Sequence, residues 1–169
     1  MLRRLFGSSR SPVSNTVLKA TGHLELKDEE YKQKLTSTQY GVLREARTEP
    51  RGITVAKGGF DDHYTPHGKY LCAGCESPLY TSEMKFDCGC GWPGFWTNIK
   101  DAVCERPDED GSRVEILCSA CKSHLGHVFR GESFQNPEPN ERHCVNSVSL
   151  KFLDEDGQVT ECTYHGIVY

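Results

Sequence analysis

The sequence has no excess of basic residues, no long apolar run and no secretory signal with an apolar core. Its 169 residues carry a formal net charge of -4 at pH 7, whereas a nucleic-acid surface would need a basic face. No segment approaches the roughly 18 consecutive apolar residues of a membrane span. We therefore expect neither a nucleic-acid partner nor a membrane partner.

Cysteine, by contrast, is abundant, with nine residues in the chain. An odd number cannot all pair within one chain, and without a secretory signal a disulfide framework is the weaker interpretation. Metal ligation combined with reactive thiols explains the number better.

The length predicts one domain with extensions, because most domains have about 100–150 residues. We place a folded domain at 28–157, preceded by a tail at 1–27 and followed by an extension at 158–169 that could add a strand. The first 21 residues are rich in arginine and serine, and no acidic residue precedes Glu25. This composition is typical of an organelle presequence, although a short tail can share it. We expect a mitochondrial or a cytoplasmic location.

Two short helical segments precede residue 47. Asp28 can cap a short turn that continues to Lys34. Thr36 and Gln39 then form a capping box, in which each side chain bonds the other residue's backbone N–H. This box predicts a helix that ends at about Ala46, before proline and glycine residues break the pattern.

After residue 46 the sequence has no long helical period, and short apolar segments alternate with turn residues. In segment 148–152 apolar and polar residues alternate, which predicts one buried and one solvated face. The sequence therefore predicts a mainly β domain. The candidate strands are 69–72, 79–86 with an interruption at Ser82, 114–117, 127–129, 148–152 and 164–169.

Two segments, 71–79 and 117–125, repeat each other at Leu, Cys, Cys, Ser and Leu. Each CxxC pair can form a knuckle whose sulfurs converge on one cation, and two knuckles complete a tetrahedron. Zn²⁺ suits four thiolates, and a closed shell leaves no position for substrate, so we predict one structural zinc ion. Redox CxxC motifs would need a βαβ setting that is missing, and iron suits the site less well. The predicted ligands are Cys72, Cys75, Cys118 and Cys121.

Cys144 is the candidate nucleophile among the remaining cysteines. It follows Arg142 and His143 directly, and cationic neighbours lower a cysteine pKa from roughly 8.5 toward 7 or below. The thiolate is the nucleophilic form, so this setting favours a reactive thiol. A buried structural cysteine with chance basic neighbours is the alternative.

A glycine-rich aromatic segment, 86–96, contains Cys88 and Cys90. Glycine lets the backbone bend, and Trp92 offers a flat apolar surface. A thiol on such a loop could act as a resolving cysteine, which forms a disulfide with an oxidised partner. The alternative is an aromatic core turn with bystander thiols, and Trp92 would pack in either case.

Two histidines, His124 and His127, follow the second CxxC pair. Four cysteines already fill the metal shell, so His127 is a candidate for donating or relaying a proton near Cys144. For His124 we favour a satisfied core histidine.

The order of these motifs resembles methionine sulfoxide reductase B over about residues 35–152. The resemblance implies two antiparallel sheets of the Mss4-like β-tent type with a zinc at one end. It also implies reduction of the R epimer of methionine sulfoxide, chiefly in proteins, by a monomer that thioredoxin reduces again. The motifs are Cys72-x-x-Cys75, Lys85-Phe86, Cys90-Gly91-Trp92-Pro93, Cys118-x-x-Cys121, His124-Leu125-Gly126-His127-Val128-Phe129 and Arg142-His143-Cys144-Val145-Asn146-Ser147.

The resemblance further implies roles for individual residues. Cys144 would attack the sulfoxide sulfur and become a sulfenic acid, and Cys90 would resolve it as a disulfide. His127 and Arg142 would hold the sulfoxide oxygen and tune the nucleophile, with Asn146 in support. The implied substrate-binding residues are Trp92, which would receive the methyl group, His124 and Phe129.

Two features depart from the pattern of the family. Gly131 stands where many members carry an acidic residue, so either Glu132 substitutes or that hydrogen bond is absent. Cys88 is an additional thiol and remains a second candidate for the resolving role.

Two other functions compete with this assignment. A non-catalytic zinc module that binds a protein partner would explain the four metal cysteines, but it gives no role to Cys90 or Cys144. A zinc ribbon for nucleic acid conflicts with the acidic charge balance. Cys104 and Cys162 have no predicted role.

Overall fold

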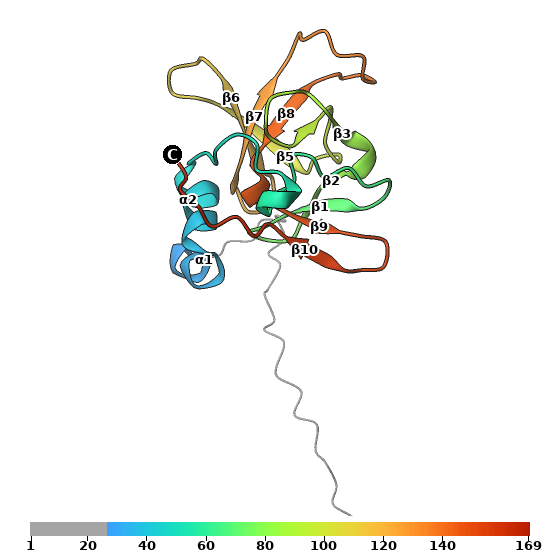
Figure 1. The fold of residues 1–169 in the computed structure, drawn as a ribbon. Coiled ribbons are helices and arrows are strands. Elements are labelled where there is room, and N and C mark those ends of the chain that lie inside the picture. The colour runs from blue at the N-terminus through green and yellow to red at the C-terminus, as the bar shows by residue number, and fades with distance from the viewer. Residues whose placement is uncertain (1–26) are drawn as a thin grey trace, which may run out of the picture.

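The computed structural model describes residues 27–169, and the arginine- and serine-rich segment considered as a presequence lies outside them. Two antiparallel sheets form the body, with two short helices on one side (Figure 1). The prediction of a mainly β fold with two antiparallel sheets and short N-terminal helices is confirmed. Within residues 27–169, no helix combines the length and the apolar character that crossing a membrane requires.

The four-stranded sheet has the order β10-β9-β1-β2, and the six-stranded sheet has the order β3-β4-β8-β7-β6-β5. The strands of the first sheet are β1 (Lys69–Cys72), β2 (Pro78–Thr81), β9 (Leu150–Leu153) and β10 (Val159–Glu161). Those of the second are β3 (Lys85–Phe86), β4 (Gly94–Phe95), β5 (Val103–Pro107), β6 (Val114–Cys118), β7 (His124–Phe129) and β8 (Arg142–Val145). Three short 3-10 helices are η1 (Val55–Lys57), η2 (Ser82–Met84) and η3 (Ser147–Ser149).

The core lies between the two sheets and is rich in aromatic rings. Tyr80 of β2 stacks on Phe95 of β4 with 4.1 Å between the ring centroids. Tyr70 of β1 meets the edge of the same Phe95 ring and also contacts Phe152 of β9. Aromatic pairs contribute roughly 0.5–1.5 kcal/mol beyond the area they bury. These contacts hold the sheets against each other.

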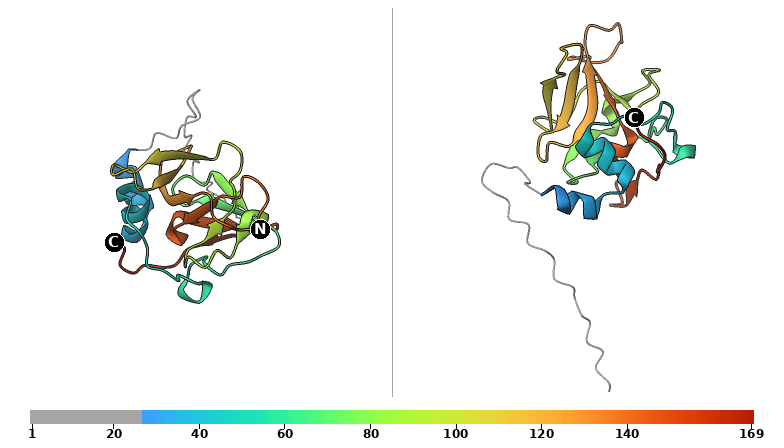
Figure 2. Two further views of the ribbon diagram at one scale, coloured as in Figure 1. Left: turned by 90° about the horizontal axis from the view of Figure 1, so that it is seen from above. Right: turned by 90° about the vertical axis from the view of Figure 1, so that its left-hand side faces the viewer.

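The N-terminal helices are α1 (Asp28–Lys34) and α2 (Ser37–Glu45). Asp28 does not cap α1 as predicted. It is the first helical residue, where a negative charge interacts favourably with the helix dipole. Lys27 precedes the helix, and its backbone N–H donates to Glu30 Oε2 at 2.8 Å. The capping box of α2 is confirmed, because Thr36 and Gln39 bond each other's backbone N–H at 3.0 and 3.2 Å. α2 packs against β7 and η3 (Figure 2).

The segment 79–86 is interrupted at Ser82, as predicted, but its two halves serve different sheets. η2 turns the chain there, so that β2 joins the four-stranded sheet and β3 joins the six-stranded one. The first half therefore packs beside the metal-binding segment, and the second leads into the loop of Cys88 and Cys90.

The solvated face predicted for segment 148–152 is wrong. Lys151 is only 8% exposed, because Glu76 and Glu161 approach its ammonium group at 2.9 and 2.7 Å from the two flanking segments. Ser149 is also fully buried and bonds the backbone oxygen of His124. Partners distant in the chain thus satisfy both polar residues inside the fold.

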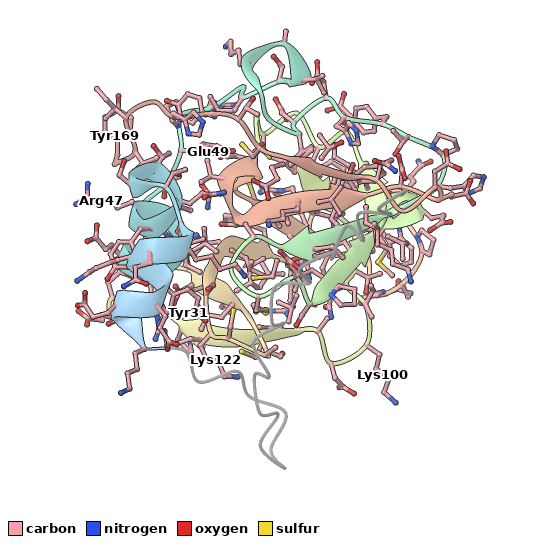
Figure 3. All side chains as sticks on the ribbon, turned by 90° about the horizontal axis from the view of Figure 1, so that it is seen from below. Tyr31, Arg47, Glu49, Lys100, Lys122 and Tyr169 are labelled. Carbon is pink, nitrogen blue, oxygen red and sulfur yellow. The ribbon has the colours of Figure 1, made fainter. Side chains whose placement is uncertain are left out.

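The strand predicted at 164–169 is also wrong. After β10 the chain runs without regular structure to α2, where Tyr169 and Thr48 exchange two backbone hydrogen bonds of 2.9 and 2.7 Å. Figure 3 shows Tyr169 beside this helix. A single residue pair fixes the end of the chain, so no strand ladder forms there.

Candidate active site and metal centre

Three cysteine sulfurs lie in contact at the centre of the six-stranded sheet. The Sγ atoms of Cys90 and Cys144 are 3.2 Å apart, and those of Cys88 and Cys90 are 3.0 Å apart. All three side chains are partly buried, and all nine cysteines of the chain are free thiols. The structure therefore brings the predicted nucleophile and both candidate resolving thiols together.

Strand β8 holds Cys144 between two other strands. Gly94 of β4 lies directly opposite Cys144 on one side, and His127 of β7 lies opposite it on the other. A side chain at Gly126 would overlap the Cys144 carbonyl oxygen, so only glycine lets β7 approach this closely. The nucleophile therefore stands on a paired, inner strand rather than on a loop.

His143 does not act on Cys144 as the sequence suggested. Neighbouring residues of a strand point to opposite faces, and the His143 ring is directed away, toward the Tyr80 hydroxyl at 3.2 Å and Glu141 at 3.1 Å. Burial lowers the pKa of His143, so the ring is neutral near pH 7. Arg142, two positions before Cys144, remains as the cationic neighbour on the same face.

Contact among the three thiols distributes one negative charge between them. Cys90 lies in the middle, and hydrogen bonds from Cys144 and then from Cys88 lower the pKa of Cys90. The same contact with Cys90, together with burial, raises the pKa of Cys144 and that of Cys88. The first thiolate of the resting site thus forms at the resolving position. When Cys144 passes its proton to Cys90 across the 3.2 Å between the two sulfurs, the negative charge moves to Cys144.

The loop that carries Cys90 is tied to the segment before η1. Arg51 donates from Nε to the Cys90 carbonyl oxygen at 2.8 Å, and Gly52 N donates to the Gly91 carbonyl oxygen at 2.6 Å. Gly91 has a φ of 85°, which favours glycine. Sequence reasoning missed Arg51, because it lies in an irregular segment that offers no motif.

A small cavity of about 110 Å³ opens beside Cys144. Its wall combines flat apolar surface with a few polar groups, which suits a ligand with a methyl group at one end and an oxygen at the other. Five predicted site residues lie together here. The lining residues are Thr48, Trp92, Arg113, Gly126, His127, Phe129, Cys144 and Asn146.

Glu49 anchors two residues of this cavity and was not predicted. Its backbone oxygen accepts from Trp92 Nε1 at 3.1 Å, and its backbone N donates to Asn146 Oδ1 at 3.0 Å. Its carboxylate accepts from the N–H groups of Ser147 at 2.7 Å and Val148 at 2.9 Å. Burial raises the pKa of Glu49 to about 7 against the effect of these bonds. In Figure 3 Glu49 lies inside the fold near the end of α2.

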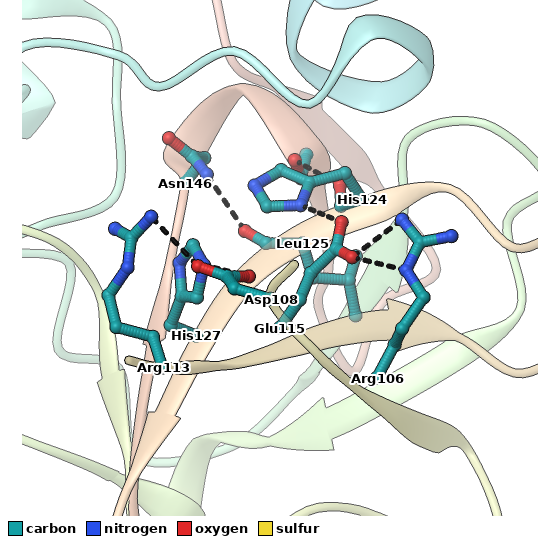
Figure 4. A network of polar contacts seen from close by, with 9 residues as sticks. Arg106, Asp108, Arg113, Glu115, His124, Leu125, His127 and Asn146 are labelled. Carbon is teal, nitrogen blue, oxygen red and sulfur yellow. Dashed lines mark hydrogen bonds and ion pairs between the residues drawn. The ribbon is translucent and has the colours of Figure 1, made fainter. Parts of the chain in front are cut away.

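His127 belongs to a chain of polar contacts (Figure 4). Its Nε2 lies 3.2 Å from Asp108 Oδ1, and Arg113 approaches the other oxygen of Asp108 at 2.9 Å. A carboxylate in this position orients the imidazole ring. Asp108 and Arg113 were not predicted, since both flank an irregular turn far from any motif.

His124 is buried and does not line the small cavity. Its Nδ1 lies 2.7 Å from Glu115, which also pairs with Arg106 at 2.6 Å (Figure 4). Burial lowers the pKa of His124, and its Nε2 has no hydrogen-bond partner among the described residues. The ring borders a separate groove of about 620 Å³, which His127 also borders. His124 is therefore a buried histidine that pairs with Glu115. It does not line the cavity beside Cys144, where the resemblance would place a substrate contact.

Arg142 also lies outside the wall of the small cavity. Its guanidinium forms a two-pronged pair with Glu132, with distances of 2.6 and 2.8 Å, and covers the Phe129 ring at 4.1 Å from the centroid. This pair lowers the pKa of Glu132 and raises that of Arg142. Glu132 thus provides the carboxylate that Gly131 cannot, one position later in the chain.

The four predicted metal ligands converge on one point. Their sulfurs all lie within 4.8 Å of one another, with Cys72 and Cys121 at 3.6 Å and Cys75 and Cys118 also at 3.6 Å. Four sulfurs bound to one zinc ion at about 2.3 Å would lie roughly 3.8 Å apart. The donor set and its spacing therefore fit a tetrahedral metal ion.

The two halves of this centre are built alike. The residue after the second cysteine of each half, Glu76 or Lys122, is left-handed with φ of 64° and 59°. In both halves its backbone N–H bonds back to the first cysteine at 2.8 Å. One half joins β1 to β2 and the other joins β6 to β7. A metal ion bound here would clamp the two sheets together.

Comparisons with known proteins agree with these features. Residues 35–154 match the SelR domain family. The chain is 48% identical over 148 residues to peptide methionine sulfoxide reductase B9 of Arabidopsis thaliana, covering 87% of this chain and 99% of that protein. It is 51% identical over 125 residues to reductase B5 of Oryza sativa subsp. japonica, covering 74% and 88%.

A third relative is longer than the part it shares. The chain is 50% identical over 129 residues to the chloroplastic peptide methionine sulfoxide reductase B2 of Arabidopsis thaliana, covering 76% of this chain but 61% of that protein. Among solved structures, the Mis18 "Yippee-like" domain is similar with a TM-score of 0.37 and 13% identity, covering 51% of this chain and 94% of the domain. By its sequence the chain belongs to the SelR domain family, and these relatives within it are peptide methionine sulfoxide reductases B.

Proposed function

We propose that this chain reduces methionine sulfoxide to methionine through Cys144 and Cys90. The observation that carries the proposal is the 3.2 Å contact between these two sulfurs, at the wall of a cavity formed by Trp92 and Phe129. A non-catalytic zinc module would need no such pair. The names of the relatives point to the same reaction.

The first step would be attack of the Cys144 thiolate on the sulfoxide sulfur. The sulfoxide oxygen is a poor leaving group unless it gains a proton, and His127, held by Asp108, is placed in the cavity to donate one. Proton transfer of this kind contributes about 10²–10⁴-fold in rate. The oxygen passes to Cys144 as a sulfenic acid, and methionine is released with its sulfur reduced by two electrons.

The second step would be condensation of Cys90 with the sulfenic acid. A sulfur–sulfur bond forms, and the oxygen leaves as water with the thiol proton. The sulfurs are already in contact, so the loop needs only a small displacement. We propose that thioredoxin, a dithiol protein, then reduces the disulfide and restores both thiols.

The cavity would bind the substrate by its two ends. Trp92 and Phe129 provide apolar surface for the methyl group, and His127 and Asn146 are polar residues of the wall that would meet the oxygen. Arg142, covering Phe129, would add positive charge on the same side. We propose that proteins carrying the R epimer of methionine sulfoxide are the substrates, that the enzyme is a monomer, and that it repairs oxidised proteins in mitochondria or in the cytoplasm.

We further propose that the four-cysteine centre holds one structural Zn²⁺. Zinc suits four thiolate ligands, and the two halves of the site come from different sheets. All four ligand positions are cysteines, so the ion would stabilise the fold and take no part in the reaction.

The test of this function is release of methionine by single-cysteine variants. Reduced Cys144→Ser protein should release no methionine from methionine sulfoxide, yet should keep its zinc. Cys104→Ser, which removes a thiol of β5 outside the site, is the matched control and should react as the unchanged chain does. Normal methionine release by Cys144→Ser would overturn the proposal.

A further inference from the structure

Cys88 occupies a place that is shaped for its sulfur. A Cβ atom at Gly94 would lie 2.6 Å from Cys88 Sγ, so the missing side chain of β4 makes room for this thiol. Gly94 is also the residue directly opposite Cys144. The third thiol therefore lies against the same short strand that flanks the nucleophile, 3.0 Å from Cys90.

We propose that Cys88 is a third redox cysteine, which takes the disulfide over from Cys144. In this step the Cys88 thiolate attacks Cys90 Sγ of the Cys90–Cys144 disulfide. The Cys88–Cys90 bond forms, the Cys90–Cys144 bond breaks, and Cys144 leaves as a thiolate. The exchange involves no net oxidation, and the proton lost by Cys88 is the one that Cys144 can regain. This proposal rests on the proposed function.

The resting contacts favour the exchange. Cys88 touches Cys90 before any oxidation, so attack requires no large movement of the loop. The pKa of Cys88 is raised chiefly by its hydrogen bond to Cys90, whereas the charge of Arg142 lowers it. Once Cys90 is part of a disulfide, it no longer carries the thiolate that holds the Cys88 proton. The Cys88 thiolate therefore forms more readily once the Cys90–Cys144 disulfide is present.

The product of the exchange would be easier for an external dithiol protein to reach than the first disulfide. A bond between Cys88 and Cys90 closes a ring over one residue, Gly89, on an exposed part of the loop. The exchange is drawn forward because the freed Cys144 thiolate reacts with the next sulfoxide. Asp87 and Gly89 are exposed, whereas Cys144 lies on an inner strand. The relay would carry the oxidation from the substrate cavity to the surface.

A relay also changes how many sulfoxides one chain can reduce without a reductant. With two working cysteines, the Cys90–Cys144 disulfide blocks the nucleophile after one turnover. With the relay, Cys144 becomes free again while the disulfide stays at Cys88 and Cys90. A second sulfoxide then reacts and leaves Cys144 as a sulfenic acid.

The test is the amount of methionine released by fully reduced enzyme with excess N-acetyl-methionine sulfoxide and no reductant. We expect about two molecules of the reduced product per chain for the unchanged sequence and about one for Cys88→Ser. Cys104→Ser, as the control for loss of one thiol, should give about two. About one product molecule per chain for the unchanged sequence would overturn the relay but not the reductase activity, and no product at all would overturn both.

The position of the disulfide gives a second, independent readout. After alkylation and trypsin digestion, Cys88 and Cys90 share the peptide 86–100, and Cys144 lies in the peptide 143–151. The relay predicts that peptide 86–100 is not alkylated, that it is lighter by two hydrogen atoms than its dithiol form, and that it is not linked to 143–151. A chain in which the two peptides stay joined by a disulfide would contradict the relay.

Discussion

Cys90 and Cys144 are separated by 54 positions in the chain, yet their sulfurs lie 3.2 Å apart. β8 carries one of them between β4 and β7, and the glycine loop before β4 carries the other. Sulfurs this close need little loop movement to form a bond. The pair therefore accounts for both halves of the proposed cycle, attack on the sulfoxide and resolution of the sulfenic acid.

Replacement of the resolving thiol should separate these halves. Cys90→Ser should still release about one methionine per chain and then stop with thioredoxin as the reductant. A small thiol should restore turnover, because it can reach the sulfenic acid directly. Steady-state assays with each reductant measure the difference. Normal turnover of Cys90→Ser with thioredoxin would assign resolution to another thiol, with Cys88 the nearest to position 90.

Removal of the metal should destabilise the fold. Purified protein should contain about one zinc ion per chain, and structural zinc sites contribute on the order of 10–16 kcal/mol in small peptides. A strong chelator should lower the melting temperature and abolish activity together, since the centre joins the two sheets. Metal analysis and thermal unfolding test this, with Mg²⁺ addition as the control that should not restore the fold. Unchanged melting of metal-free protein would rule out the clamp.

The buried carboxyl of Glu49 should make stability depend on pH. Its pKa is raised from 4.5 to about 7 in the folded chain, so the folded state binds more protons than the unfolded state within that range. Stability from this group is full below about pH 4.5 and is lost as the pH rises through 7. The loss is on the order of 3 kcal/mol.

Denaturant unfolding of the unchanged chain and of Glu49→Gln at several pH values isolates this contribution. Between pH 4.5 and 7 the unfolding free energy of the unchanged chain should fall relative to that of Glu49→Gln, because glutamine does not titrate. A difference that stays constant, or that shifts the other way, would show that Glu49 has no raised pKa.

The close approach of β7 to β8 should fail with any side chain at position 126. Gly126→Ala places a methyl group against the Cys144 carbonyl oxygen, and overpacking of this kind costs about 1–3 kcal/mol. Activity should fall as well, since the nucleophile moves. Gly111→Ala is the matched control, because its φ is also positive, at 67°, but nothing lies within 4 Å. Equal melting temperatures for the two variants would disprove the steric requirement.

The sequence predicted those parts of the fold that depend on local spacing. The CxxC pairs, the capping box of α2 and the interruption at Ser82 all involve residues a few positions apart, and all three agree with the structure. The resolving pair came from a resemblance, because no local rule connects Cys90 with Cys144. Their contact depends on the pairing of β4 with β8.

Two of the predictions fail for different physical reasons. The basic flank of Cys144 predicts a cationic neighbour at His143, but strand alternation turns that ring toward Tyr80. The alternating pattern predicts Lys151 in solvent, but Glu76 and Glu161 from other segments pair with it. The residues that position the cavity wall and the histidine, such as Glu49 and Asp108, lie in irregular segments where sequence gives no pattern.

The reaction of Cys90 with oxidised Cys144 can be observed alone by locating the disulfide in Cys88→Ser, in which no relay can occur. Reduced protein is mixed with methionine sulfoxide without a reductant, alkylated, digested with trypsin and analysed by mass spectrometry. We expect about one methionine per chain and a disulfide that joins peptides 86–100 and 143–151. Methionine release with Cys90 fully alkylated would contradict it.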